Sequence, residues 1–106
     1  SMKTYFEKED GAYFAFIAEN PVFSLLRHEI GVTVCTGDDY ERPPVPESVS
    51  RYQMDSALAI KQIIVSGYVA DAEIVERNNI EVQNTLSEKG FSEQSIDELF
   101  VLAAMQ

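Results

Sequence analysis

The 106-residue sequence predicts an α+β fold, in which a small N-terminal antiparallel β-sheet (a hairpin plus a third strand) precedes a C-terminal bundle of three to four helices. Three observations lead to this prediction: an Asp-Gly pair between aromatic-rich apolar stretches, a cluster of prolines, and apolar residues at helical spacing beyond it. A chain of this length suits one domain. We expect a single domain over 1–106, with a β-rich half at 1–40, a proline-rich linker at 41–49 and a helical half at 50–106.

The N-terminal strands are predicted from their turn. Asp10-Gly11 favours a hairpin, because such a turn needs the positive φ that glycine adopts freely. Its strands are expected near 3–8 and 12–18. Asn20-Pro21 then starts a turn or a short helix, and the stretch EIGVTVCTG is predicted as the third strand.

The middle of the chain, DDYERPPVPES, is predicted as a linker. Its three prolines remove backbone hydrogen-bond donors and favour an extended polyproline conformation. Pro43 and Pro46 also form a PxxP spacing after Arg42, a pattern bound by aromatic-grooved peptide-binding domains. Such short matches are common by chance, which favours the linker interpretation.

Three N-terminal caps mark the predicted helices. Ser50 precedes Gln53 at the spacing of a capping box, and Asp71 and Ser92 stand at equivalent positions farther along. Gly67 and Gly90 are expected to end helices. The predicted helices cover 50–66, 71–89 and 92–105. The middle one contains two modest helix formers, Asn78-Asn79, so a break there into two short pieces is an alternative.

The last helix contains a run, LFVLAAM, that is apolar around its whole circumference. Such a helix lies either at the centre of a bundle or against another molecule. A domain this small offers little to surround it. The run therefore predicts a protein interface, for which the candidate residues are Leu99, Phe100, Val101, Leu102 and Met105.

Composition argues against two classes of partner. The net charge of −10, from 8 basic and 18 acidic residues, repels a nucleic-acid backbone, so no direct nucleic-acid binding is expected. Residues 1–50 and 51–106 each hold 4 basic and 9 acidic residues, an even distribution that favours a solubility surface over a concentrated nucleic-acid mimic. No apolar run approaches the roughly 20 residues of a membrane span, so no membrane association is expected either.

Sequence motifs for catalysis or metal binding are missing. His28 and Cys35 are the only histidine and cysteine, and a lone cysteine in a strand is most often a small buried hydrophobe rather than half of a nucleophilic pair. Glycine-rich phosphate loops, GxSxG and HExxH do not occur. Two acidic groups lack the frame of a calcium loop: Glu7-Glu9-Asp10 and Asp38-Asp39-Glu41. We predict no enzyme, no metal site and no cofactor.

The C-terminal half resembles small proteins encoded near the tail genes of tailed bacteriophages and prophages. The resemblance runs from PVPESVSRYQMDSALAI through SGYVADAEIVE to GFSEQSIDELFVLAA, and TYFEKEDGAYFA is similar to the Tyr-Phe hairpin that begins tail-fibre-assembly proteins. The residues that match the pattern are Val49, Ser50, Arg51, Gln53, Leu58, Gly67, Gly90, Phe91, Ser92, Ile96, Asp97, Leu99, Phe100, Ala103 and Ala104.

The resemblance implies a phage-encoded, non-enzymatic accessory protein, such as a tail or tail-fibre assembly factor, that acts by binding another protein. The expected partner is a phage structural protein or a host factor, and a second copy meeting through the C-terminal helix is an alternative. The alternative function is an acidic inhibitor of a host defence system, of anti-CRISPR or DNA-mimic type. The expected location is the host cytoplasm or the virion.

Overall fold

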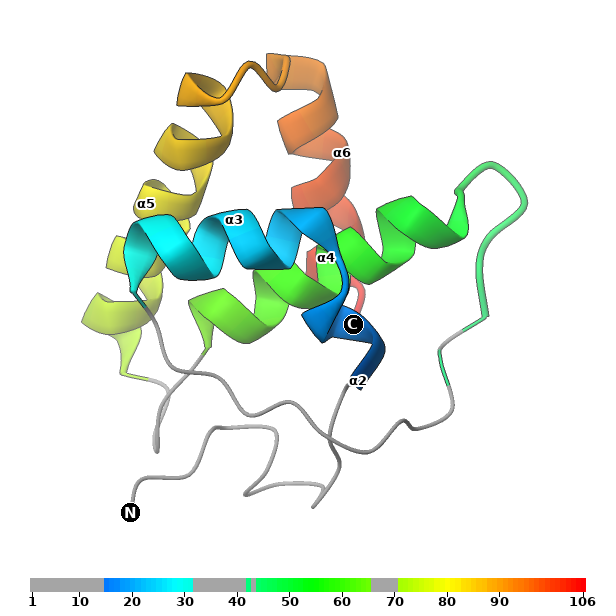
Figure 1. The fold of residues 1–106 in the computed structure, drawn as a ribbon, viewed down its shortest axis with the longest axis horizontal. Helices are drawn as coiled ribbons and strands as arrows, with labels where there is room; N and C mark the ends of the chain where they lie inside the picture. The colour runs from blue at the N-terminus through cyan, green and yellow to red at the C-terminus, as the bar shows by residue number, and fades with distance from the viewer. Residues whose placement is uncertain (1–14, 32–41, 43, 66–70) are drawn as a thin grey trace.

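The computed structural model describes residues 15–31, 42, 44–65 and 71–106, and all regular structure within them is helical. Five helices occur in this part of the chain, and no strand does. Their labels follow Figure 1. They are α2 (Ala15–Ala18), α3 (Pro21–Ile30), α4 (Arg51–Ile64), α5 (Ala72–Glu88) and α6 (Glu93–Ala104).

Helix α4 is the central element of the fold. Ten of its fourteen residues are buried, and they occur on every side of the helix. The four other described helices each pack against α4, with α6 and α3 making the most extensive contacts. A helix that is apolar nearly all round needs such enclosure. The central position in the bundle, one of the two alternatives predicted for the last helix, is therefore occupied by α4.

The helices form two crossed pairs around this centre. In Figure 1, α3 and α4 lie side by side and run in the same direction, while α5 and α6 form an antiparallel hairpin that stands across them. The buried residues of α5 and α6 point into the shared core. They are Asn78, Val82 and Leu86 of α5, and Ile96, Leu99, Leu102 and Ala103 of α6.

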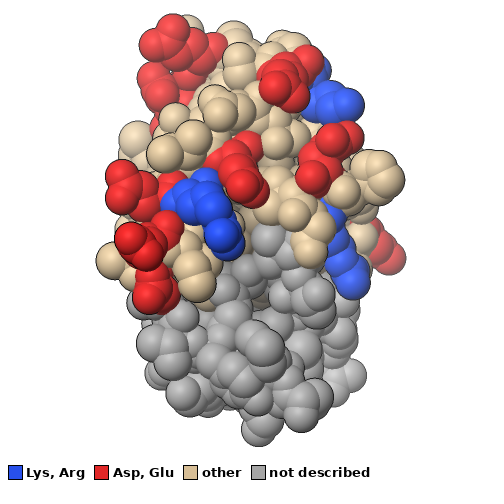
Figure 2. All heavy atoms as spheres, turned by 90° about the vertical axis from the view of Figure 1, so that its left-hand side faces the viewer, with Lys and Arg blue, Asp and Glu red and all other residues tan. Residues whose placement is uncertain are grey.

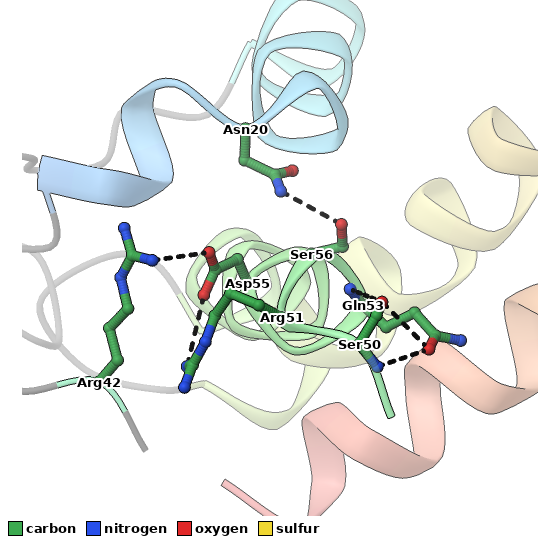
Figure 3. A network of polar contacts seen from close by, with 7 residues as sticks. All are labelled: Asn20, Arg42, Ser50, Arg51, Gln53, Asp55 and Ser56. Atoms are coloured by element: carbon green, nitrogen blue, oxygen red, sulfur yellow. Dashed lines mark hydrogen bonds and ion pairs between the residues drawn. The ribbon is translucent and has the colours of Figure 1, made fainter. Parts of the chain in front are cut away.

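Asn20 fixes the start of α3 against α4. Its side-chain oxygen accepts hydrogen bonds from the backbone N–H groups of Val22 and Phe23, at 2.9 and 3.2 Å, as an N-cap does. The amide nitrogen of the same side chain donates to Ser56 Oγ on α4 over 3.2 Å, and both residues are buried (Figure 3). Pro21 follows at the first helical position, where its missing N–H costs nothing. The predicted short helix at Asn20-Pro21 is confirmed.

The predicted capping box at the start of α4 is also confirmed. Gln53 N–H donates to Ser50 Oγ over 3.1 Å, and Ser50 N–H donates to Gln53 Oε1 over 3.0 Å (Figure 3). One turn farther along, Asp55 faces two guanidinium groups, at 3.6 Å from Arg42 and 4.0 Å from Arg51. These contacts attach residue 42 to the central helix.

Asn78 closes the opposite end of α4. Its side-chain amide donates to the carbonyl oxygens of Ile63 and Ile64, at 3.3 and 3.1 Å, and the residue is buried. These carbonyls belong to the last turn, which has no intrahelical donors of its own. Helix α5 runs unbroken through Asn78 and Asn79, so the alternative of a break is wrong. Asparagine is a modest helix former, but here the side chain of Asn78 makes hydrogen bonds to another helix.

The turn between α5 and α6 follows the predicted caps. Gly90 has φ of +96°, its N–H donates to the Ser87 carbonyl, and the N–H of Phe91 donates to the Leu86 carbonyl. This pair of bonds is a Schellman motif, which needs a residue with positive φ at the glycine position. Ser92 then caps α6 by accepting from the Ser95 N–H. Gly67 lies outside the described residues.

The predicted N-terminal β-sheet is wrong. Residues 15–18, the second half of the expected second strand, form α2, and the expected third strand begins inside α3, which continues to Ile30. Gly31 then ends α3 with φ of +76°. The hairpin at Asp10-Gly11 and the remainder of the third strand lie outside the described residues.

The error has a physical reason. A short apolar run has no periodicity of its own, so it fits a buried strand and a buried helical turn equally well. Phe16 and Ile17 are both buried, and α2 packs against α4 as one turn of helix. In a strand, neighbouring side chains would point to opposite faces. Packing against α4 therefore decided the local conformation.

Replacing Asn78 should weaken the fold more than replacing an exposed asparagine of the same helix. We expect Asn78→Ala to lower the free energy of unfolding by roughly 1–3 kcal/mol, because the last turn of α4 loses the buried side-chain amide that donates to it. Asn84→Ala, at an exposed position of α5, should change it by less than about 0.7 kcal/mol. Urea unfolding followed by circular dichroism measures both, and equal effects would contradict the capping role.

Replacing Gln62 should stabilise the fold, in contrast to replacing Asn78. Gln62 is 1% exposed, and neither its amide oxygen nor its amide nitrogen has a hydrogen-bond partner in the part of the chain that the structure describes. Gln62→Met, similar in shape, should raise the free energy of unfolding by about 1–2 kcal/mol. The exposed Gln83→Met is the control. Destabilisation by the Gln62 substitution would contradict this account.

Candidate functional site

A groove lies between the start of α4 and one side of α6, with a volume of about 840 Å³. Most of its lining surface is apolar. We call it the α4–α6 groove, and its lining residues are Ser48, Val49, Gln53, Glu93, Gln94, Asp97, Glu98, Val101 and Leu102.

One wall comes from the segment that leads into α4. Val49 is half-buried and packs on the hydrophobic core, immediately before the Ser50 cap. Gln53 is held by its reciprocal hydrogen bonds with Ser50. These contacts fix the wall in position, because the capping box and the packed residue before it together set the direction in which the chain enters the helix.

The other wall is the solvent-facing side of α6. Glu93, Asp97 and Glu98 lie along it, all exposed, and Gln94 donates to Glu98 Oε1 over 3.2 Å. None of the three carboxylates forms an ion pair within the described part of the chain, and no lysine or arginine lines the groove. The groove therefore combines an apolar surface with an unneutralised acidic wall.

The structure divides the five predicted interface residues among four environments. Leu99 is buried, at 6% exposure, and belongs to the core. Val101 and Leu102 line the groove, the first 61% exposed and the second buried at its base. Met105, just past the helix, is 67% exposed. The residues that are free to meet a partner are therefore Val101 and Met105.

Phe100, the fifth residue, turns away from the groove. It is half-buried and lines a smaller hollow of about 220 Å³ between α4, α5 and α6. Lys61 and Asn79 line the same hollow, and the side-chain oxygen of Asn79 is buried without a hydrogen-bond partner among the described residues. This hollow has no acidic residue in its lining.

Negative charge is concentrated in the α5–α6 hairpin. Residues 71–106 contain eight acidic and two basic residues, a net charge of −6. The described residues between 15 and 65 contain four of each. Figure 2 shows acidic side chains outnumbering basic ones over the described part of one face. The even count in the two halves of the sequence therefore conceals an uneven distribution among the helices.

Of the two residues considered for catalysis, the structure describes only His28. His28 is exposed in the last turn of α3, as expected for a helix-end residue. Cys35 lies outside the described residues, as do both acidic groups weighed as calcium loops. Within residues 15–31, 42, 44–65 and 71–106, no three His, Cys, Asp or Glu side chains are grouped so that they could hold a metal ion.

Sequence reasoning missed half of the groove. It selected the apolar run of α6 but not Val49 or Gln53, which form the facing wall from about fifty residues earlier. Both positions carried a usable signal as parts of a helix start. The sequence did not indicate that this helix start lies beside α6, because that proximity depends on how the pair α5 and α6 crosses α4.

Comparison with protein-family models found no match to the chain, and neither curated proteins nor solved structures gave a significant match. The helical-bundle description is correct for the described residues. The description as a phage tail-assembly protein has no support in these comparisons. Among the described helices, none has both the length and the hydropathy of a membrane span.

The division of the apolar run predicts unequal effects on stability. Leu102→Ala should lower the free energy of unfolding by roughly 2–4 kcal/mol, because it opens a cavity at the base of the groove. Val101→Ala should change it by less than about 0.5 kcal/mol, as an exposed position does. Chemical denaturation tests the pair. Similar losses at both positions would mean that Val101 is covered by the chain itself.

Proposed function

We propose that this chain is a non-enzymatic protein-interaction module that binds a segment of another protein in the α4–α6 groove. The observation that carries the proposal is the exposed Val101 beside an apolar hollow whose two walls come from distant parts of the chain. Large apolar side chains that border a concave surface are typical of binding sites, whereas isolated exposed ones are ordinary.

The form of the groove suits a short element better than a flat protein surface. It is bounded on one side by a helix and on the other by a capped helix start, and its base is formed by Leu102. Grooves of this kind accept the apolar face of a helix or an extended peptide. Because the capping box already holds Gln53 in place, little ordering of that wall is needed on binding.

A peptide selection tests this proposal without knowledge of the natural partner. A displayed library of random peptides is selected on the full chain, and the selected peptides are measured against Val101→Gln. We expect binding to weaken about fivefold to thirtyfold, the equivalent of roughly 1–2 kcal/mol for the lost apolar contact. Glutamine is a good helix former, so the helix should persist.

Ile80→Gln is the matched control, because Ile80 is 52% exposed on α5 and lies outside the groove. It should leave the affinity unchanged. Nuclear magnetic resonance shift changes should map the selected peptides to Val49, Gln53 and Val101. The proposal fails if no peptide is enriched, or if the enriched peptides bind elsewhere.

A second candidate, an acidic inhibitor that occupies the nucleic-acid groove of another protein, is favoured by the net charge of −6 on the α5–α6 hairpin. Such an inhibitor would use carboxylates from both helices of the hairpin, since a nucleic-acid backbone presents charge over a broad surface. The lining of the α4–α6 groove, in contrast, contains carboxylates of α6 and none of α5. Neutralising the carboxylates of one helix at a time distinguishes the acidic inhibitor from the groove-binding module.

A further inference from the structure

The charge of the groove walls identifies the class of partner. We infer, on the basis of the proposed function, that the α4–α6 groove binds a basic amphipathic segment, whose apolar residues enter beside Val101 and Leu102 while its lysines or arginines face the carboxylates of α6.

The acidic wall supplies the electrostatic complementarity. Glu93, Asp97 and Glu98 lie within about 1.4 turns of α6, so their carboxylates follow one side of the groove over more than a full helical turn. The described part of the chain provides no ion-pair partner for any of them. Complementary charge steers the encounter and excludes wrong partners, and an acidic segment would be repelled here.

The apolar part of the groove supplies binding free energy that the charged residues alone do not. Exposed ion pairs contribute little each, because water and salt screen them. Val49 adds apolar surface on one wall of the groove and Leu102 at its base, and Val101 adds a side chain that is 61% exposed. A segment with apolar residues on one face and cations beside them satisfies both walls at once.

A second copy of this chain is a poor occupant by the same reasoning. Each copy carries a net charge of −10, and the hairpin that contains the groove carries −6 of it. The basic residues of 71–106 are only Arg77 and Lys89, and Lys89 already lies 3.4 Å from Glu29. A homodimer through the groove would therefore bring like charges together.

The test uses two synthetic amphipathic helical peptides of identical apolar pattern, one with lysines and one with glutamates at the polar positions. Fluorescence anisotropy measures their binding to the full chain at low and moderate salt. The lysine peptide should bind, and more weakly as salt shortens the screening length, while the glutamate peptide should bind at least about tenfold more weakly.

Two charge-matched triple variants locate the effect. Glu93→Gln, Asp97→Asn and Glu98→Gln together should weaken binding of the lysine peptide about tenfold and remove most of its salt dependence. The control neutralises three carboxylates along a shallow hollow of α5: Glu73→Gln, Glu76→Gln and Glu81→Gln. Each triple removes three charges and includes one first-turn glutamate, and the control should change the affinity less than about threefold.

The outcomes separate the inference from the function on which it rests. Equal losses from both triples would overturn the inference, because net charge rather than the groove would then attract the peptide. Equal binding of the lysine and glutamate peptides at the groove would overturn it too, while the proposed function would stand. If neither these peptides nor library-selected ones bind the groove, both fail.

Discussion

Enclosure of α4 is the constraint on which the described structure depends. A helix with ten of fourteen residues buried leaves almost no side for solvent, so the chain must place an element against each of its faces. Helix α3 lies along one side, α6 along another, and α5 closes the C-terminal end through Asn78. The apolar residues supply most of the stabilisation, whereas the buried polar contacts set the positions of the helices.

The polar contacts lie where helices begin or end. Asn20 joins the start of α3 to Ser56, and Asn78 joins the end of α4 to α5. Arg42 stacks on Phe16, at 4.3 Å from the ring centre, while it pairs with Asp55. The two asparagine contacts each fix one helix at a defined height along α4, and Arg42 contacts both α4 and α2.

The core-facing side of α6 is buried against the rest of the domain, whereas its outer side is not covered. The groove lies along this uncovered side. Leu99 and Leu102 turn toward the core, and Val101, one position from Leu102, is left beside the hollow. The exposed acidic residues keep this side in water when no partner is present. An apolar strip with carboxylates next to it is therefore compatible with a soluble surface and with selective binding.

Helix starts were the most predictable feature of the sequence, because a cap is a local interaction. Ser50, Asp71 and Ser92 all begin helices as predicted, and Gly90 ends one. The N-terminal fold class was not predictable from apolar runs, because the conformation of Phe16 and Ile17 depends on α4, which comes about forty residues later. For the same reason the apolar run of α6 was found, but its division into buried and exposed residues was not.

Native-state hydrogen exchange of individual backbone amides tests the central position of α4 most directly. If α4 is the enclosed helix, the amides from Met54 to Ile64 should exchange only through global unfolding and be the slowest of residues 51–106. Amides on the outer side of α6, near Val101, should exchange faster through local opening. Slower exchange in α6 than in α4 would contradict this account, because α6 would then be the helix around which the domain is built.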